Sequence, residues 1–409
     1  MKIDPSITLI PLLWCCAIIN LASSKVEAKL IINEINYSVK DEDGVEDFSK
    51  EWIEIYNSGP QEIALQGWRI SAGVNYVFPN YVIDPESFVV VAADPERFAS
   101  FYPDAPEALG PWVGKLSNTG ERIRIRDGSN KEIDQVDYAD EGFWASRKTG
   151  PDDRGHEGWV WEALHDGGGR SLELVNWADK NNNGQNWSSS ILEGGTPGQQ
   201  NSVYDPKLVP LIESISHFPV LPKSTDPVRV TIKIDNSSRF DDLGLELFWK
   251  VDGAADDFAS MDMKVNEEGA YFAEIPEQQD KSVIEFFFVL GVGENESRQW
   301  PLRILGKGNV CNYLYMVDDD YEHNDSVPSY YVIMTDAERG ELEEIGRRSS
   351  QSDSNAEMNC TFISFDGKGE RVRYLSSIRN RGASSRNGPP NNHLIKFRSD
   401  DSWNGQESI

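Results

Sequence analysis

Strict alternation of apolar and polar residues is the feature that most limits how this 409-residue chain can fold. In residues 228–235, Val and Ile alternate with Arg, Thr, Lys and Asp. Residues 245–251 and 284–290 repeat the pattern, with apolar side chains at every second position. Successive side chains of a β-strand point to opposite faces, so such stretches place one face in a core and the other towards solvent. We therefore expect a small β-sandwich over residues 206–306.

A second group of short β-type runs lies upstream, between residues 29 and 140. The runs are rich in Ile, Val, Trp and Tyr, and turn residues separate them, which favours a sandwich over βαβ units. The predicted strands are Leu30–Tyr37, Glu51–Asn57, Gly67–Ser71, Tyr76–Phe78, Phe88–Ala92, Ile123–Asp127 and Ile133–Tyr138. The expected fold class is therefore mainly β.

Motifs in this region resemble those of a lamin tail domain. In chain order they are Ile32–Asn36, Glu51–Asn57, Leu65–Trp68, Leu116–Glu121 and Val136–Tyr138. The resemblance implies an immunoglobulin-like sandwich that serves bacterial exported proteins as an accessory module, without catalysis. The sandwich over residues 206–306 is expected to be immunoglobulin- or fibronectin-like as well, and to act as a spacer.

Three glutamates of the first unit, Glu34, Glu51 and Glu54, are candidates for paired acid–base carboxylates. The resemblance places them at ordinary strand positions of the domain. We therefore expect them on solvated strand faces, with no catalytic role.

The charge of the chain limits its partners. The formal net charge is −29 and no long run of Lys and Arg is present. A protein that binds nucleic-acid phosphates needs a positive surface, so nonspecific nucleic-acid binding is excluded. We interpret the acidity as solubility outside the cell, and divalent-cation loading is the alternative.

The first 28 residues have the pattern of a secretory signal peptide. Lys2 precedes the apolar run Ile7–Leu21, and Val26 and Ala28 fit the −3 and −1 positions of a cleavage site. We expect export to the cell surface or medium, with an uncleaved anchor as the alternative. No later stretch is long and apolar enough for a membrane span in the mature chain.

Residues 141–205 are rich in Gly, Asp and Trp, and we expect an extension and linker with one last strand at residues 171–174. The segment 179–190 resembles half of an EF-hand loop but has Ser190 where the bidentate Glu belongs. It is read either as a calcium site or as a polar turn. His156 and His165 lack a third ligand at metal spacing and are expected at the surface.

Residues 307–409 differ from both sandwiches. Thr335 and Glu338 form a capping box that predicts a helix to about Arg348, with Glu338 reaching back to the start of the helix. Residues 358–365 and 371–378 read as an antiparallel pair of strands. The segment is therefore expected to be α+β.

A small-residue turn flanked by basic residues follows these strands. Its backbone N–H groups, hydroxyls and guanidiniums could hold phosphate oxygens. The candidate phosphate-binding residues are Arg381, Gly382, Ser384, Ser385, Arg386 and Lys396. The alternatives are the end of a surface hairpin with incidental arginines, or a site for an anionic partner.

With residues 330–335 upstream and 394–397 downstream, this turn resembles the start of the spore-coat-protein-H (CotH) kinase family. The resemblance implies an atypical protein kinase that uses ATP and Mg²⁺ to phosphorylate Ser or Thr. Residues 391–393 depart from the family, which usually has a basic pair and an aromatic there. The catalytic acids are expected beyond Ile409, so the kinase-like segment is incomplete and this chain alone is expected to be inactive. Residues 318–320 are three aspartates that we read as a solvated linker.

A hypothesis of another class is a non-catalytic adhesion protein whose sandwiches bind a protein or polysaccharide. Exposed aromatic rings bind sugars, and the candidates are Trp144, Trp159, Trp161 and Trp177. Two cysteines remain after the leader, Cys311 and Cys360. They are expected either as a disulfide or as two buried thiols.

Overall fold

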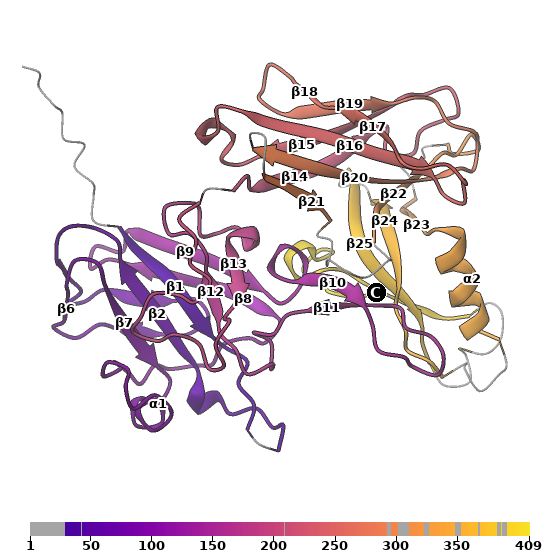
Figure 1. The fold of residues 1–409 in the computed structure, drawn as a ribbon. Helices are drawn as coiled ribbons and strands as arrows, with labels where there is room; N and C mark the ends of the chain where they lie inside the picture. Colours follow the sequence, from indigo (N-terminus) through magenta and orange to yellow (C-terminus); the bar gives the residue numbers. More distant parts are fainter. Residues whose placement is uncertain are drawn as a thin grey trace, which may run out of the picture.

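The computed structural model describes residues 29–41, 43–207, 209–292, 296–301, 311–322, 327–347, 353–366, 369–382, 386 and 391–409. Figure 1 shows a first sandwich at one side, a second sandwich above, and a C-terminal sheet below the second sandwich. The predicted leader, residues 1–28, lies outside the described residues. Within the described part of the chain, none of the helices has the length and apolar character needed to span a membrane.

The first sandwich packs two sheets, with strand orders β13-β12-β1-β2-β7 and β5-β4-β8-β9. Each strand predicted between residues 29 and 140 corresponds to a strand of the structure. The two-residue strands β3 and β6 were not predicted. The strands are β1 (Leu30–Asn36), β2 (Trp52–Asn57), β3 (Ile63–Ala64), β4 (Arg69–Ser71), β5 (Tyr76–Val77), β6 (Val82–Ile83), β7 (Ser87–Ala92), β8 (Gly120–Arg126), β9 (Glu132–Ala139), β12 (Leu172–Leu174) and β13 (Trp187–Ser189).

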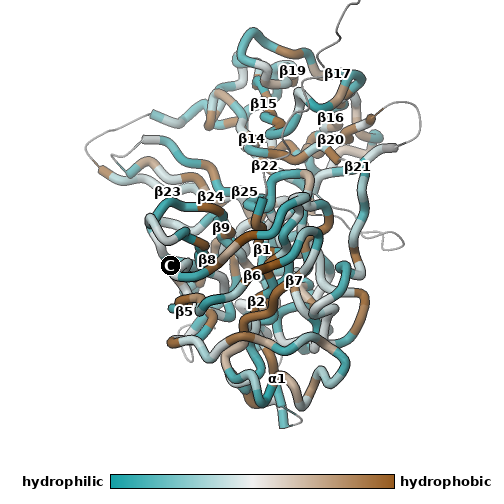
Figure 2. The backbone as a smooth tube through the Cα atoms, turned by 90° about the vertical axis from the view of Figure 1, so that its left-hand side faces the viewer, coloured by the Kyte–Doolittle hydropathy of each residue, from teal (hydrophilic) through white to brown (hydrophobic). Residues whose placement is uncertain are grey.

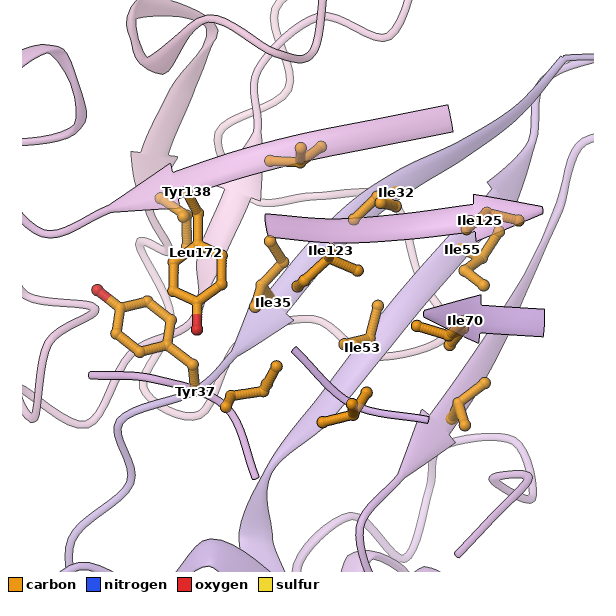
Figure 3. Packing of buried hydrophobic residues seen from close by; sticks show 14 of the residues in the cluster. Ile32, Ile35, Tyr37, Ile53, Ile55, Ile70, Ile123, Ile125, Tyr138 and Leu172 are labelled. Carbon is orange, nitrogen blue, oxygen red and sulfur yellow. The ribbon is translucent and has the colours of Figure 1, made fainter. Parts of the chain in front are cut away.

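The core of this sandwich includes isoleucines from β1, β2, β4 and β8, which pack together between the two sheets (Figure 3). Ile32 and Ile35 both contribute although they are three residues apart, because the β1–β2 register shifts between Ile32 and Glu34. Such a bulge places an extra residue in one strand and resets which face the following side chains occupy. Figure 2 shows hydrophobic residues along β2 and β7 in the same unit.

Helix α1 (Pro95–Phe101) covers the other face of β2. The Asp94 carboxylate accepts hydrogen bonds from the Glu96 and Arg97 N–H groups, and Pro95 occupies the first turn. Phe98 packs edge-on to Trp52, with ring centroids 6.1 Å apart. All six residues of β2 are therefore buried.

The structure of residues 141–205 differs from the predicted extension and linker. It is more than an extension and linker, because β12 pairs with β1 and β13 with β12, which extends the first sheet. The expected last strand at residues 171–174 corresponds to β12. The remainder of the segment supplies a hairpin, β10 (Ser146–Thr149) and β11 (Trp159–Glu162), which reaches towards the C-terminal sheet (Figure 1).

The second sandwich consists of the sheets β14-β15-β19-β18 and β17-β16-β20-β21. The predicted alternation holds in β15, where Val228, Val230 and Ile232 are buried and Arg229 and Lys233 are exposed. The expected boundary at residue 306 is too early, because β22 pairs with β20. The strands are β14 (Ile212–Phe218), β15 (Val228–Ile234), β16 (Leu243–Val251), β17 (Ala259–Asp262), β18 (Lys264–Val265), β19 (Tyr271–Ile275), β20 (Val283–Val292), β21 (Glu296–Trp300) and β22 (Tyr313–Met316).

The C-terminal sheet has the order β23-β24-β25-β26 and carries helix α2. Leu342 and Ile345 of α2 pack with Met358 and Ile378 of the sheet. The predicted pair of strands is therefore present, as β24 and β25. The bounds are β23 (Ser329–Ile333), α2 (Asp336–Ile345), β24 (Met358–Phe365), β25 (Glu370–Asn380) and β26 (His393–Lys396).

One of the two hydrogen bonds predicted for the capping box of α2 is present. The Thr335 hydroxyl accepts a hydrogen bond from the Glu338 N–H at 3.2 Å. The Glu338 carboxylate does not reach back, because it accepts from Trp159 Nε1 at 2.6 Å and from the Asn359 N–H at 2.9 Å. Tertiary partners from the β10–β11 hairpin and the sheet thus replace the local bond.

Candidate functional site

The predicted phosphate-binding turn lies between β25 and β26. Arg381 and Gly382 are exposed, and Gly382 has a φ of +96°, in the region that favours glycine. Ser384 and Ser385 lie outside the described residues. The structure thus shows an exposed basic residue and a glycine turn at one end of the predicted site.

Arg386 is buried, and its guanidinium contacts the protein itself. Nη2 donates to the carbonyl oxygens of Ser354 and Asn380, at 2.6 and 3.1 Å. It also lies 3.3 Å from Asn355 Oδ1. These bonds fasten the end of the turn to the segment before β24, so Arg386 has a structural role here.

Lys396 forms an ion pair with Glu357, whose carboxylate also lies 3.7 Å from Arg379 Nε. A phosphate at this edge would compete with Glu357 for Lys396. Of the described basic residues predicted to contact phosphate, Arg381 is exposed, and the Lys396 side chain is 44% exposed beside Glu357.

The aspartates at 318–320, predicted as a solvated linker, are only partly so, because Asp319 and Asp320 are exposed and Asp318 is not. Asp318 is buried and pairs with Lys281. The Asp319 carboxylate accepts from the Ser224 N–H at 2.7 Å and from its hydroxyl at 2.8 Å. These contacts attach the segment to the second sandwich.

The three glutamates expected on solvated faces are all buried, at 1% exposure or less. Burial, together with the neighbouring Glu173 carboxylate, raises the pKa of Glu34 to about 8. Burial also raises the pKa of Glu51 to about 8 and that of Glu54 well above its usual range. The expectation was wrong because neighbouring segments cover both faces of these strands.

The glutamate cluster, Glu34, Glu54 and Glu173, fastens a loop onto the first sheet. Glu34 accepts from the Thr196 N–H at 2.9 Å, and Glu54 accepts from the Gly198 N–H at 2.5 Å. Glu173 accepts from the Thr196 hydroxyl at 2.9 Å. Loop N–H and hydroxyl groups therefore satisfy these carboxyls, which indicates a structural role.

The half EF-hand segment is a polar turn in the structure. Asp179 accepts from Asn236 Nδ2 at 2.6 Å, and Asn181 Nδ2 donates to Asp134 at 2.6 Å. The Asn183 side chain caps a 3₁₀ turn at residues 184–186. In the part of the chain that the structure describes, no three His, Cys, Asp or Glu side chains group as a metal site.

The two histidines are buried, not at the surface as predicted. His165 is 1% exposed, and burial lowers its pKa to about 4. Its Nδ1 lies 2.8 Å from the Ser189 hydroxyl. His156 is 6% exposed and its Nδ1 lies 3.1 Å from Glu341 Oε1. Both side chains join segments that are distant in the sequence.

The four candidate sugar-binding tryptophans are used in packing. Trp144 is buried against Trp187, and Trp177 stacks on Tyr204 with centroids 4.0 Å apart. Trp161 lies under the Arg147 guanidinium, at 5.0 Å, and both Trp159 and Trp161 pack against the core of the second sandwich. This arrangement gives no support to a flat aromatic surface for polysaccharide.

Cys311 and Cys360 are free thiols in the structure, and both are buried. Burial raises the pKa of Cys360 to about 12 and raises that of Cys311 as well. Buried thiols of high pKa are unreactive, so the second of the two alternatives is the one observed.

Two large cavities lie where the units meet. One, of about 860 Å³, is lined by the first sandwich, the second sandwich and the C-terminal residues. The other, of about 480 Å³, is lined by the β10–β11 hairpin, the second sandwich, α2 and β24. The carboxylates of Asp252, Glu285, Glu338 and Glu341 are among the residues that line this second cavity.

Comparison with known proteins gives a result for the first unit. No curated protein matches the chain. The family model of the Lamin Tail Domain matches residues 23–140. This match ends at the residue where the first expected domain ends, and it supports the predicted resemblance. The N-terminal part of this modular chain therefore contains a lamin tail domain.

Proposed function

We propose that this chain is an exported, modular protein in which two β-sandwiches hold a nucleotide-binding segment in a fixed position. The segment would be the N-terminal part of a CotH-type protein kinase domain that uses ATP and Mg²⁺. The proposal rests on the way the first sandwich reaches the C-terminal sheet, and on the exposed basic turn of that sheet.

The main support for this proposal is the set of contacts between the β10–β11 hairpin and the C-terminal sheet. Arg147 Nη1 donates to the Leu375 carbonyl at 2.7 Å, in the middle of β25. The Trp159 N–H donates to the Glu357 carbonyl at 2.8 Å, just before β24. Together with the Trp159–Glu338 bond, these contacts fix the hairpin against the sheet and α2.

A second set of contacts joins the same units. The Phe143 N–H donates to the Asp400 carboxylate at 2.9 Å, and the Ser399 N–H donates to Glu141 at 3.2 Å. Strand β22 adds to the sheet of the second sandwich. A spacer on a flexible linker would not make these contacts, so the arrangement favours presentation of the C-terminal segment in one orientation.

The chemistry proposed for the segment needs positive charge on the phosphates and acids that hold Mg²⁺. Arg381 and Lys396 would supply the charge, with Lys396 leaving Glu357. The acids would follow Ile409, as the resemblance implies. Kinase activity is therefore proposed for a longer form of the chain.

The test is a calorimetric titration of ATP with Mg²⁺ into the longest form that the host makes. Combined Arg381→Ala and Lys396→Ala is expected to weaken binding at least about tenfold, because two charge-assisted contacts are lost. Arg371→Ala is the matched control, since Arg371 is an exposed arginine of β25. Equal affinity of the double variant and the parent would reject the nucleotide site.

A separate experiment tests whether the sandwiches hold the C-terminal segment in a fixed position. Limited proteolysis of Trp159→Ala should show earlier cleavage between the sandwiches and the C-terminal sheet than in the parent. Unchanged cleavage would reject fixed presentation, whatever the ATP result.

A further inference from the structure

Residues 194–203, which we call the strap, form a loop that lies on the first sheet and leads towards the second sandwich. The sequence of the strap, Gly-Gly-Thr-Pro-Gly-Gln-Gln-Asn-Ser-Val, contains no titratable side chain. Neutral contacts hold both of its ends. The Gly194 N–H donates to the Gly169 carbonyl at 2.8 Å, and Tyr204, which follows the strap, stacks on Trp177. The charge that the strap meets therefore comes from the sheet.

The glutamate cluster lies under the strap, on three neighbouring strands. The register places Glu34 of β1 directly opposite Glu173 of β12 and directly opposite Glu54 of β2. All three side chains are buried. The Cβ atoms of directly opposite residues in antiparallel strands lie about 4.5–5.5 Å apart, so like charges at such positions repel. Three ionised carboxylates here would destabilise the contact between sheet and strap.

The position of the Thr196 hydroxyl indicates that the cluster holds a proton. Thr196 Oγ1 lies 2.9 Å from Glu173 Oε1 and 3.2 Å from Glu34 Oε2. A hydroxyl has one hydrogen to donate, and an ionised carboxylate has none. Both contacts are hydrogen bonds only if one of the two carboxyls is protonated and donates to the Thr196 oxygen. The geometry thus gives one shared proton to Glu34 and Glu173.

The other hydrogen bonds to these two carboxyls come from neutral groups. The Ser171 hydroxyl donates to Glu34 at 2.5 Å. The Ser202 hydroxyl and the Val203 N–H donate to Glu173 at 2.7 and 3.1 Å. Neutral donors bring no positive charge to oppose the carboxylates. Loss of the shared proton would therefore leave two adjacent negative charges in a buried place.

Three further titratable groups border the strap. The Tyr102 hydroxyl, just after α1, donates to the Gly194 carbonyl at 2.8 Å, and burial raises the pKa of Tyr102 above its usual value of 10. Arg170 Nη1 donates to the Ser190 carbonyl at 2.7 Å. Glu193 is exposed to solvent. Tyr102 thus stays neutral near pH 8, and the carboxyls of the cluster determine how the strap responds to pH.

We propose that the strap is a pH-sensitive device, which rising pH releases from the first sheet. With the shared proton in place, the Thr196 hydroxyl joins Glu34 to Glu173 and keeps the strap docked. When the proton leaves, two carboxylates face one hydroxyl hydrogen, and the strap exchanges its contacts with them for water. The neutral contacts at both ends remain, so the change is local and reversible. The inference is independent of the kinase proposal.

The direction of the response follows from the proton that docking retains. Burial, with the Glu173 carboxylate, raises the pKa of Glu34 from 4.5 to about 8. The docked form therefore keeps a proton between these values, and the released form loses it. The stability that this group gives to docking is full below about pH 4.5 and is lost as the pH rises through 8. Each pH unit in this window should favour release about tenfold.

The experiment is hydrogen–deuterium exchange of the intact chain between about pH 6 and 8, corrected for the intrinsic pH dependence of exchange. The protection of the strap should fall at least about tenfold over this range, because each opening releases a proton. Peptides from β1, β2 and β12 should keep their protection. Constant protection of the strap would overturn the proposal, and so would an equal loss in the strands, since the whole sandwich would then be opening.

The decisive variant is Glu34→Gln, because an amide copies the protonated carboxyl. Its Nε2 can donate to the Thr196 oxygen at any pH, and the Thr196 hydrogen then goes to Glu173. The strap should therefore stay protected up to about pH 8. Glu173→Gln acts in the same way from the other side of Thr196 and serves if Glu34→Gln does not fold. A fall in protection equal to that of the parent in the folded variant would overturn the shared proton.

The matched control is Glu51→Gln. Glu51 is buried in the same sandwich and burial raises its pKa to about 8, but its carboxylate accepts from the Leu116 N–H at 2.9 Å. This variant removes the same charge and should leave the pH dependence of the strap unchanged. If it abolished the fall in protection as Glu34→Gln does, the general negative charge of the sandwich would be responsible, and the proposal would be overturned.

Discussion

The two sandwiches of this protein bury their strands in different ways. In the second sandwich, β15 alternates between buried apolar and exposed polar residues. In the first, all seven residues of β1 and all six of β2 are buried, including Glu34 and Glu54. Alternation of apolar and polar residues therefore predicts a strand with one face exposed to solvent. Polar residues in a strand do not by themselves predict that their side chains are exposed.

The difference arises from what covers the second face of each sheet. Helix α1 and the loop at residues 194–203 lie on the first sheet, and the glutamate cluster binds the loop. In the second sandwich, the side chains opposite the core include the Arg229–Glu274 pair, about half exposed. The first sandwich thus holds buried carboxyls where the second has surface ion pairs.

The largest expected effect tests the apolar cores. Phe288→Ala in β20 removes a fully buried ring that stacks on Tyr313, and should lower the free energy of unfolding by about 3–5 kcal/mol. Denaturant titration measures it. Val265→Ala, at a position that is 56% exposed, should change the free energy by less than about 0.5 kcal/mol. A loss under 1 kcal/mol for Phe288→Ala would contradict a single packed core.

Much of this architecture could be predicted from the sequence. The alternation of apolar and polar residues predicted β15, β16 and β20. The motifs typical of a lamin tail domain predicted the first unit and its strands. The capping residue Thr335 marked the start of α2. These patterns depend on residues that are close in the sequence, so they can be recognised without knowledge of tertiary contacts.

The burial of polar residues could not be predicted in the same way. Glu34, His165 and Asp318 have partners 24 to 162 residues distant, or in another unit. No spacing along the chain marks such pairs. The Gly194–Gly198 run was the one available signal, because glycines there allow the loop to approach the carboxylates closely.

The second prediction uses this close approach. Gly195 has a φ of +87°, and a Cβ there would lie 2.2 Å from Glu34 Oε1. Gly195→Ala should therefore cost more than the roughly 1–2 kcal/mol of the backbone conformation alone. Gly44→Ala is the control, with a φ of +77° and no atom within 4 Å. Equal melting temperatures for the two variants would mean that the loop is not fastened as described.

The third prediction concerns the pH dependence of stability, which should differ between the two sandwiches. The pKa of Glu51 is about 8 in the folded protein, against 4.5 ordinarily, so the folded form binds an extra proton between these values. Stability contributed by this group is full below about pH 4.5 and is lost as the pH rises through 8. Glu51→Gln should flatten the fall of unfolding free energy over this window. An unchanged slope would place the titrating groups elsewhere.

The smallest expected effect lies at the junction of the second sandwich with β25. His217 Nδ1 bonds the Tyr374 hydroxyl, and its Nε2 donates to the Val220 carbonyl at 2.9 Å. Burial lowers the pKa of His217 to about 4, so the imidazole is neutral and Nδ1 accepts. Tyr374→Phe removes the donor and keeps the ring, and should cost about 1 kcal/mol in denaturant titration.

The same pair gives the opposite pH dependence to the buried glutamates. The pKa of His217 is below its ordinary value of 6.5, so the unfolded chain binds the extra proton between about pH 4 and 6.5. Stability from this group is full above 6.5 and is lost as the pH falls towards 4. His217→Gln should reduce the acid-side loss without altering the fall towards pH 8, whereas Glu51→Gln should do the reverse. If each variant changed both limbs, the buried groups of the two sandwiches would have to titrate as one coupled set.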